Sequence, residues 1–346
     1  MTRWQQVCTW SIVIIIIISA LYAVSEILLP FLVGMAIAYF LDPVLDYMER
    51  IGFSRLLATI TVTLFFFLLV ILIVLVLAPI LQEQLVGLAR KFPLILDNVI
   101  AELSPYRRII QEYIPKQHVE DFGNLSQSLS GQAVKWILGL VKGLFVGGMA
   151  IFNILSLIFI TPVICFYFLR DWDKLVSKVD SWLPRNQVGK IRELSLQIDV
   201  TIAQFVRGQS IICLLLAVFY SIGLIAIGLD FGLLIGLISG LISFIPLLGV
   251  IIGLLLAGAT AFFQFGEFTQ VFMVLLLFLI GQILEVAILT PKLVGESIGL
   301  HPVWVILSLL AGGALFGFLG VLLAIPVAAS IGVIMRALLA GYLQGP

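Results

Sequence analysis

The chain has 346 residues, of which 62% are hydrophobic and only 11% are charged, whereas an ordinary soluble domain carries about 25% charged residues. Its 19 basic and 19 acidic residues balance, so net charge does not favour nucleic acid as a partner. The composition excludes a soluble domain and predicts an all-α integral membrane protein whose main partner is the lipid bilayer.

The apolar runs predict about eight membrane helices, because one span needs about 20 apolar residues. In chain order the runs are Ser11–Leu29, Pro30–Tyr47, Leu57–Ile80, Leu144–Leu169, Ile211–Leu229, Phe231–Phe265, Thr269–Leu289 and Pro302–Leu339. Two of them are too long for one straight span and are interrupted, one at Pro246 and the other around Phe316–Gly320. Each interrupted run fits a hairpin, a re-entrant pair or a kinked long helix. The Leu29–Pro30 junction leaves open whether the first two runs are separate spans.

Two polar sections divide the chain into five regions. The regions are N-terminal transmembrane helices (1–80), an amphipathic section (81–143), a transmembrane helix (144–169), a second amphipathic section (170–209) and a C-terminal transmembrane core (210–340). Apolar residues recur at helical spacing in both polar sections, which predicts amphipathic helices outside the membrane. The second section is richer in Lys and Arg, so the positive-inside rule favours a cytoplasmic location for it, a periplasmic location for the first, and two cytoplasmic termini.

Motifs for common chemistries are missing from the sequence. The three cysteines have neither CxxC nor Cys/His spacing, and no GxxxxGK[ST], HExxH or GxSxG motif occurs. We therefore expect no metal site, no cofactor and no catalytic residue, and a protein that is not an enzyme.

Small residues recur every four positions on both sides of Pro246, as Gly232, Gly236 and Gly240 before it and as Gly249, Gly253 and Ala257 after it. Such ladders let helices approach closely in lipid, so the two halves are predicted to pack tightly on each other or on adjacent helices. Paired interrupted segments also point to the binding site of a transporter, since unwound backbone at membrane depth survives only where protein or water satisfies it.

Polar residues inside or beside the spans are the candidate functional groups. Gln282 and Glu285 are three residues apart on one helix face, where Glu285 is either a site of proton or cation coupling or a hydrogen-bonded structural carboxylate. Arg207 and Gln209 stand where a basic section enters a span, and Arg207 either reaches the lipid headgroups or contacts an anionic substrate or an ion-pair partner. His301 either titrates near neutral pH or has a structural role.

The segment LTPKLVGESIGLHP, residues 289–302, is predicted to connect two spans. Pro291 should end a helix, Gly295 and Gly299 should supply turns or close contacts, and Pro302 should begin the next helix at its first position. The other positions at which we expect a helix break or a gating movement are Pro246, Gly249, Gly313, Gly317, Gly320 and Pro326.

Residues 281–329, GQILEVAILTPKLVGESIGLHPVWVILSLLAGGALFGFLGVLLAIPVAA, closely resemble the autoinducer-2 exporter family of bacterial permeases. The shared pattern comprises Gln282, Glu285, Pro291, Gly295, Gly299, Leu300-His301-Pro302, Gly312-Gly313, Phe316-Gly317, Gly320, Ala324 and Pro326. The stretches SFIPLLGV and VRGQ match two further blocks, and the likeness covers nearly the whole length. Asp42 departs from the pattern, since many members have asparagine there.

The resemblance implies a multi-pass transporter of the bacterial cytoplasmic (inner) membrane, with both termini in the cytoplasm. It also implies a homo-oligomer, pentameric in the family, with an elevator-like mobile part. Three functions stay open: export of a small polar solute such as a quorum-sensing signal, Na⁺(Li⁺)/H⁺ antiport with Glu285 as the titrating site, and a non-transporting scaffold that acts through residues 81–132. The substrate is accordingly a small molecule or a cation.

Overall fold

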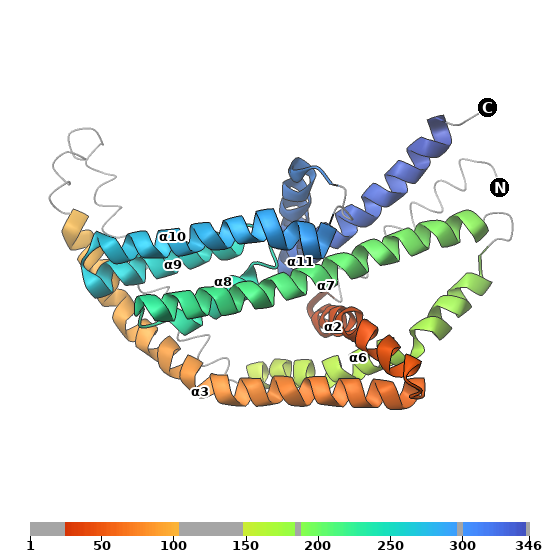
Figure 1. Ribbon diagram of the computed structural model, residues 1–346, viewed down its shortest axis with the longest axis horizontal. Coiled ribbons are helices and arrows are strands. Elements are labelled where there is room, and N and C mark those ends of the chain that lie inside the picture. Colours follow the sequence, from red (N-terminus) through yellow and green to blue (C-terminus); the bar gives the residue numbers. More distant parts are fainter. Residues whose placement is uncertain (1–24, 104–147, 184–187, 296–299, 344–346) are drawn as a thin grey trace. The chain divides into compact units, whose positions relative to one another are not determined.

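The computed structural model describes residues 25–103, 148–183, 188–295 and 300–343, and every regular element in these ranges is a helix (Figure 1). The α-helices are α2 (Ser25–Arg50), α3 (Arg55–Leu103), α6 (Gly148–Ser181), α7 (Val188–Ile227), α8 (Gly232–Ile242), α9 (Leu248–Phe265), α10 (Phe268–Leu284) and α11 (Pro302–Leu343). A π-helix, η2 (Glu285–Val294), follows α10 directly. Within the described residues, six helical segments are long and apolar enough to cross a bilayer. The predicted all-α integral membrane fold is therefore confirmed.

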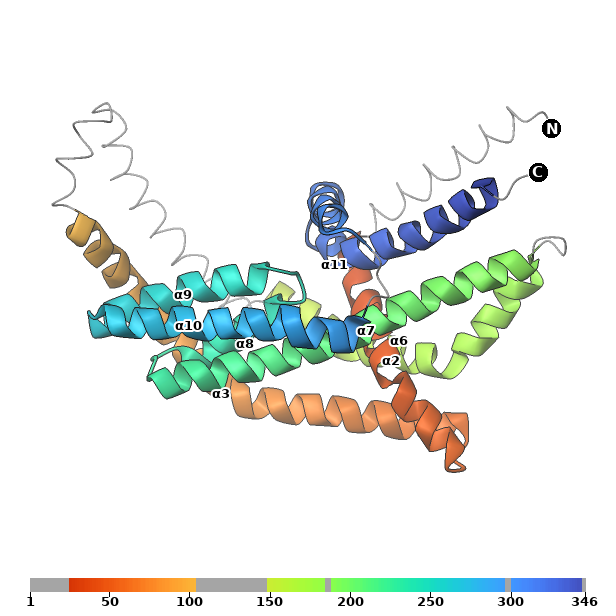
Figure 2. The ribbon, with the colours of Figure 1, turned by 45° about the horizontal axis from the view of Figure 1, so that its top comes forward.

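Several helices are longer than the apolar runs that predicted them. Helix α3 continues past Ile80 to Leu103, and α7 joins 188–209 to the next apolar run without interruption (Figure 2). Pro30 lies inside α2, so the Leu29–Pro30 junction does not separate two helices. A helix keeps its backbone hydrogen bonds internal in lipid and in water alike, so a change in surface polarity does not end it. Residues 104–143 and most of the run that begins at Ser11 lie outside the described residues.

The chain forms two compact units, each assembled from separate segments. Unit 1 contains residues 1–67, 155–209 and 293–346, and unit 2 contains residues 68–154 and 210–292. Their boundaries fall inside helices α3, α6, α7 and η2, so these long helices belong partly to one unit and partly to the other. The five polarity regions predicted from the sequence run consecutively along the chain, whereas each compact unit is assembled from pieces of several regions.

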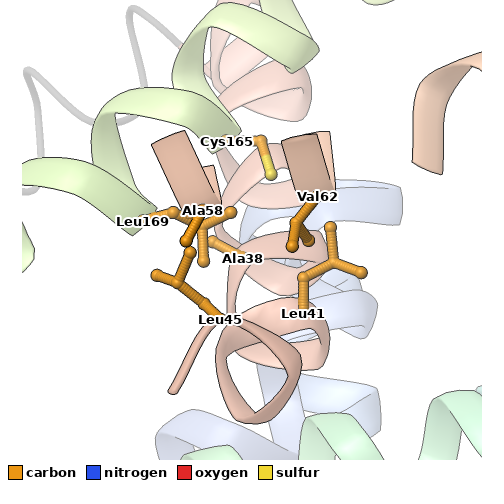
Figure 3. Packing of buried hydrophobic residues seen from close by; sticks show 7 residues of the cluster. All are labelled: Ala38, Leu41, Leu45, Ala58, Val62, Cys165 and Leu169. Atoms are coloured by element: carbon orange, nitrogen blue, oxygen red, sulfur yellow. The ribbon is translucent and has the colours of Figure 1, made fainter. Parts of the chain in front are cut away.

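A small apolar core in unit 1 joins α2, α3 and α6. Figure 3 shows its seven buried side chains, which are Ala38, Leu41, Leu45, Ala58, Val62, Cys165 and Leu169. On each helix these residues are three or four positions apart, which places them on one face. Cys165 is free and fully buried, so it acts as a small hydrophobic residue, as its apolar neighbours predict.

Polar contacts at the ends of these helices reinforce unit 1. The Arg55 guanidinium donates from Nε and Nη2 to the Leu169 carbonyl oxygen, at 3.2 and 2.9 Å, and forms an ion pair with Asp173 at 2.8 Å. Arg192 on α7 donates two hydrogen bonds to the Asp180 carboxylate on α6, at 2.6 and 2.5 Å. This bidentate contact lowers the pKa of Asp180 below its ordinary value and ties the adjoining ends of α6 and α7 together.

The interruption at Pro246 in unit 2 produces a helical hairpin, with α8 and α9 packed against each other. Because α8 has 11 residues, its length of about 16 Å is too short to cross a hydrocarbon core of about 30 Å. The chain reverses between the two helices, where Leu247 adopts a positive φ of 71°. Gly249 lies against Ser243 and Gly253 lies against Ser239, as in an antiparallel pair. A kinked long helix is therefore excluded for this segment.

The two glycine ladders serve different contacts in unit 2. Gly232, Gly236 and Gly240 of α8 lie against α7, where a Cβ atom would overlap Leu224, Ser221 and Ala217 respectively. The second ladder lies against α8 and α10, since Gly253 contacts both the Ser239 hydroxyl and the Phe278 ring. Both alternatives predicted from the sequence thus occur together: the halves pack on each other and also on neighbouring helices.

Helix α11 contains a second reversal, at Gly317. This glycine has φ 58° and ψ −137°, a left-handed conformation that favours glycine. Gly312 and Gly320 contact each other across the reversal, although eight residues of straight helix would separate them by about 12 Å. Pro326 lies farther along, inside the second arm of α11, and no helix break occurs there.

Candidate functional site

The candidate residues Gln282 and Glu285 lie where α10 changes into the π-helix η2. Gln282 belongs to the last turn of α10, and Glu285 is the first residue of η2. The sequence predicted that Pro291 ends a helix. In the structure Pro291 lies inside η2, which continues to Val294. Proline lacks an N–H donor and its ring clashes with the carbonyl four residues earlier, and the wider π-turns accommodate both defects. Gly295 then ends the element with a φ of 66°.

Glu285 is the main polar group of this region, with only 7% of its surface exposed. Its carboxyl receives no hydrogen bond or ion pair from residues that the structure describes. Water and lipid headgroups stabilise a surface carboxylate, whereas a buried one needs a partner or a proton. A proton or a bound cation would satisfy Glu285.

Tyr220 of α7 completes the site, and sequence reasoning missed it. Its side chain is fully buried, and its ring stacks on Phe278 of α10 with centroids 4.5 Å apart and planes inclined by 23°. The phenol oxygen lies against Gly281, where a Cβ atom would overlap the ring. Gly281 is four residues before Glu285, so both are on one face of the helix.

Two buried polar atoms at this site have no partner among the described residues. They are the Tyr220 hydroxyl and Gln282 Oε1. Most buried polar groups in folded proteins are hydrogen-bonded, and one left unsatisfied costs about 1–3 kcal/mol. The unpartnered atoms and the Glu285 carboxyl therefore form a polar site with capacity for a proton, an ion or a solute. We name these three residues the Glu285 site.

A second polar cluster lies in unit 1 around Arg207. Arg207 Nη2 forms an ion pair with Asp42 at 2.9 Å, and Arg207 Nε donates to the Tyr39 carbonyl oxygen at 2.6 Å. The Tyr39 hydroxyl donates to Asp199 at 2.7 Å. A cavity of about 430 Å³ lies beside these groups, and its charged lining residues are Asp42, Asp46, Arg55, Asp173, Asp199 and Arg207. Of the roles proposed for Arg207, the ion-pair contact is the one that the structure shows.

Removing the Tyr39 hydroxyl is expected to weaken unit 1 modestly. We expect Tyr39→Phe to lower the free energy of unfolding by about 1 kcal/mol, because Asp199 loses its hydrogen-bond donor. Chemical denaturation of the purified protein in detergent measures the change. Tyr167→Phe is the matched control, since the Tyr167 side chain is 53% exposed. Equal losses in the two variants would show that the bond to Asp199 contributes nothing.

The remaining candidates, Gln209 and His301, lie in α7 and just before α11. Gln209 is buried in α7, and its neighbour Gly208 lies against the backbone of Leu293. His301 is exposed and caps α11: its carbonyl accepts the Trp304 N–H at 2.8 Å, and its Nδ1 accepts the Val303 N–H at 3.4 Å. Helix α11 begins at Pro302, as predicted, whereas Gly299 lies outside the described residues.

The structure thus divides the candidates between two groups. Gln282 and Glu285 belong to unit 2, while Arg207, Gln209 and His301 belong to unit 1. The partners that sequence reasoning missed are Tyr220, Tyr39, Asp42 and Asp199. Asp199 left a signal in the helix period, because it is eight residues before Arg207 and so lies on the same helix face. Asp42 was noted only as a departure from the family pattern. Among the described residues, no group of three or more His, Cys, Asp or Glu could hold a metal ion.

Helical hairpins interrupted by glycine or proline, together with buried polar residues, are typical of secondary membrane transporters. Residues 11–340 match the family model described as AI-2E family transporter, so the chain belongs to the AI-2E transporter family. The class expected from the sequence is therefore confirmed: the protein is a multi-pass membrane transporter.

Relatives from distant bacteria share nearly the whole length. PerM of Escherichia coli K12 is 28% identical over 317 residues, which cover 90% of this chain and 88% of PerM. YrrI of Bacillus subtilis 168 is 25% identical over 312 residues, covering 90% and 86% of the two chains. MT0215 of Mycobacterium tuberculosis is 22% identical over 348 residues, covering 97% and 92%. The names of these relatives describe a proposed permease and two proposed transport proteins.

Proposed function

We propose that this transporter exports a small polar solute across the bacterial cytoplasmic membrane and couples export to proton movement at Glu285. The observation that carries the proposal is the burial of Glu285 without a hydrogen-bond or ion-pair partner among the described residues. When a buried carboxyl gains or loses a proton, the charge inside the protein changes. Such a change can drive a conformational step. The resemblance supports the inner membrane, the cytoplasmic termini and a solute such as a quorum-sensing signal.

Na⁺(Li⁺)/H⁺ antiport is a second candidate, and the same site favours it. Hard cations prefer oxygen ligands, and the Glu285 site offers a carboxylate, an amide oxygen and a phenol oxygen. In the antiport mechanism, Na⁺ or Li⁺ would compete with a proton for Glu285. The two candidates differ in cargo, while the coupling residue is the same.

Flux measurements on the purified full-length protein in liposomes test both candidates. A pH gradient should drive uptake or release of a labelled polar solute in the first case, and Na⁺ or Li⁺ gradients should drive proton movement in the second. A pH-sensitive dye inside the liposomes reports the proton. Cation-driven proton movement without solute flux selects the antiporter. Absence of both fluxes across pH 6 to 9 contradicts the proposal and favours the scaffold that acts through residues 81–132.

We also propose that the transporter assembles as a homo-oligomer. The support is the resemblance, which implies a pentamer. Light scattering of the protein in detergent, corrected for the bound detergent, measures the mass of the complex. A particle of one chain would contradict the proposal.

A further inference from the structure

Tyr220 lies against Gly281, one helical turn before Glu285, although the proposed function gives Tyr220 no role. Its hydroxyl is buried and has no hydrogen-bond partner among the described residues, yet a tyrosine hydroxyl in an apolar environment normally has one. A phenylalanine would fill the same volume and keep the stack on Phe278. The hydroxyl therefore adds nothing to the packing of the ring. Because its burial without a partner destabilises the folded protein, its presence needs another explanation.

The helix geometry directs Glu285 toward this hydroxyl. Side chains on a helix point back toward its N-terminus and cover the preceding turn. For Glu285 the preceding turn contains Gly281, and the Tyr220 hydroxyl lies against Gly281. Because Gly281 has no side chain, nothing on that residue separates the carboxyl from the phenol. A rotamer of Glu285 that lies along this path would place its carboxyl beside the phenol.

Few titratable groups other than Glu285 occur on α8, α9, α10, η2 and residues 210–227 of α7. Helices α8, α9 and α10 contain no Asp, Glu, Lys, Arg or His. Residues 210–227 of α7 contribute Cys213 and Tyr220, and η2 contributes Lys292, which is exposed. On these elements of unit 2, Tyr220 is thus the only residue with a buried, titratable hydroxyl group that can donate a hydrogen bond to Glu285.

We infer that the Tyr220 hydroxyl donates a hydrogen bond to Glu285 when this carboxyl is ionised, and that it thereby sets the pH at which the transporter loads and releases its proton. The inference rests on the proposed function, because it assigns Tyr220 to the same coupling step. A hydrogen bond to a carboxylate is stronger than one to a neutral acid. The phenol therefore stabilises the ionised form selectively and acts as a positioning residue. The proton itself leaves from the Glu285 O–H group to water, and the phenol keeps its own proton.

Infrared titration of the full-length protein in liposomes tests the inference without a known substrate, using the proton alone as the probe. The carboxylic acid C=O band of Glu285 is assigned by its disappearance in Glu285→Gln and is followed as the pH is raised. In Tyr220→Phe the titration midpoint should move to higher pH by about one unit, because the ionised form loses its donor. In Phe278→Leu the hydroxyl remains, so a smaller shift is expected.

A second variant covers the case in which Tyr220→Phe does not fold. Incorporation of 3-fluorotyrosine at position 220 makes the phenol a stronger donor with little change in shape, so the midpoint should move to lower pH. An unchanged midpoint in the folded variant, phenylalanine or fluorotyrosine, overturns the inference. If Glu285→Gln still abolishes proton-coupled flux in that case, the proposed function stands. If no band disappears in Glu285→Gln, then Glu285 does not titrate, and both the inference and the coupling role fail.

Discussion

Replacing Gly240 with alanine is expected to destabilise the protein by about 3 kcal/mol, although the change adds only one methyl group. A Cβ atom at this position would overlap the backbone N and Cα atoms of Ala217 in α7. Backbone atoms cannot rotate away, so α8 must separate from α7 along the whole first glycine ladder. Membrane helices associate through close packing, and a separation of this kind removes it. Because a folded protein is stable by only about 5–15 kcal/mol, such a loss is severe.

Thermal unfolding of the purified protein in detergent measures this effect, together with the fraction that elutes as a single species. Gly258→Ala is the matched control, because no atom lies within 4 Å of a Cβ at that position in α9. The control should be neutral or slightly stabilising, since alanine favours helix more than glycine does. If Gly240→Ala and Gly258→Ala unfold at the same temperature, the close contact between α8 and α7 does not hold the helices together.

Replacing Glu285 with glutamine is expected to abolish proton-coupled transport while the protein stays folded. Glutamine has nearly the same shape as protonated glutamic acid but cannot release a proton, so the site stays permanently in its neutral form. The buried position loses no hydrogen bond or ion pair to described residues. Flux driven by an imposed pH gradient should fall to the level of protein-free liposomes, and the remaining solute movement should no longer depend on pH.

The matched control is Glu267→Gln, the same chemical change at the exposed start of α10. This variant should transport at the rate of the unmodified protein, because Glu267 is exposed and is not part of the Glu285 site. Coupled flux that persists in Glu285→Gln at the original rate and with the original pH dependence would remove Glu285 from the mechanism. The buried carboxyl would then be structural, which is the alternative that the sequence left open.

Local features of the chain were predicted well from the sequence alone. Apolar runs identify membrane helices because the bilayer leaves few other ways to satisfy a backbone. Interruptions near Pro246 and around Gly317 were expected, because proline and glycine change the torsions and hydrogen bonds of their own residues. That the chain reverses at both places was only one of the alternatives that the sequence left open. The start of α11 at Pro302 follows from the same local chemistry.

At two prolines the prediction from local sequence was wrong. Pro291 was expected to end a helix and Pro326 to mark a break, yet both lie inside helices. Around Pro291 the backbone widens into a π-helix, a solution for which the sequence has no separate signal. Whether a proline breaks a helix depends on neighbours that can satisfy the freed carbonyl groups, and those neighbours come from the tertiary packing.

By itself, the amino-acid sequence determined the class of protein, the helical segments, the positions of the two interruptions and the presence of an unusual carboxylate at Glu285. Only the tertiary structure showed which side chains lie near that carboxylate and which helices pack against each other. Tyr220 reaches Gly281 from a different helix, and Arg207 reaches Asp42 across 165 positions of the chain. The physical reason is that torsions and helix periodicity depend on near neighbours, whereas ion pairs and close glycine contacts depend on how separate helices pack.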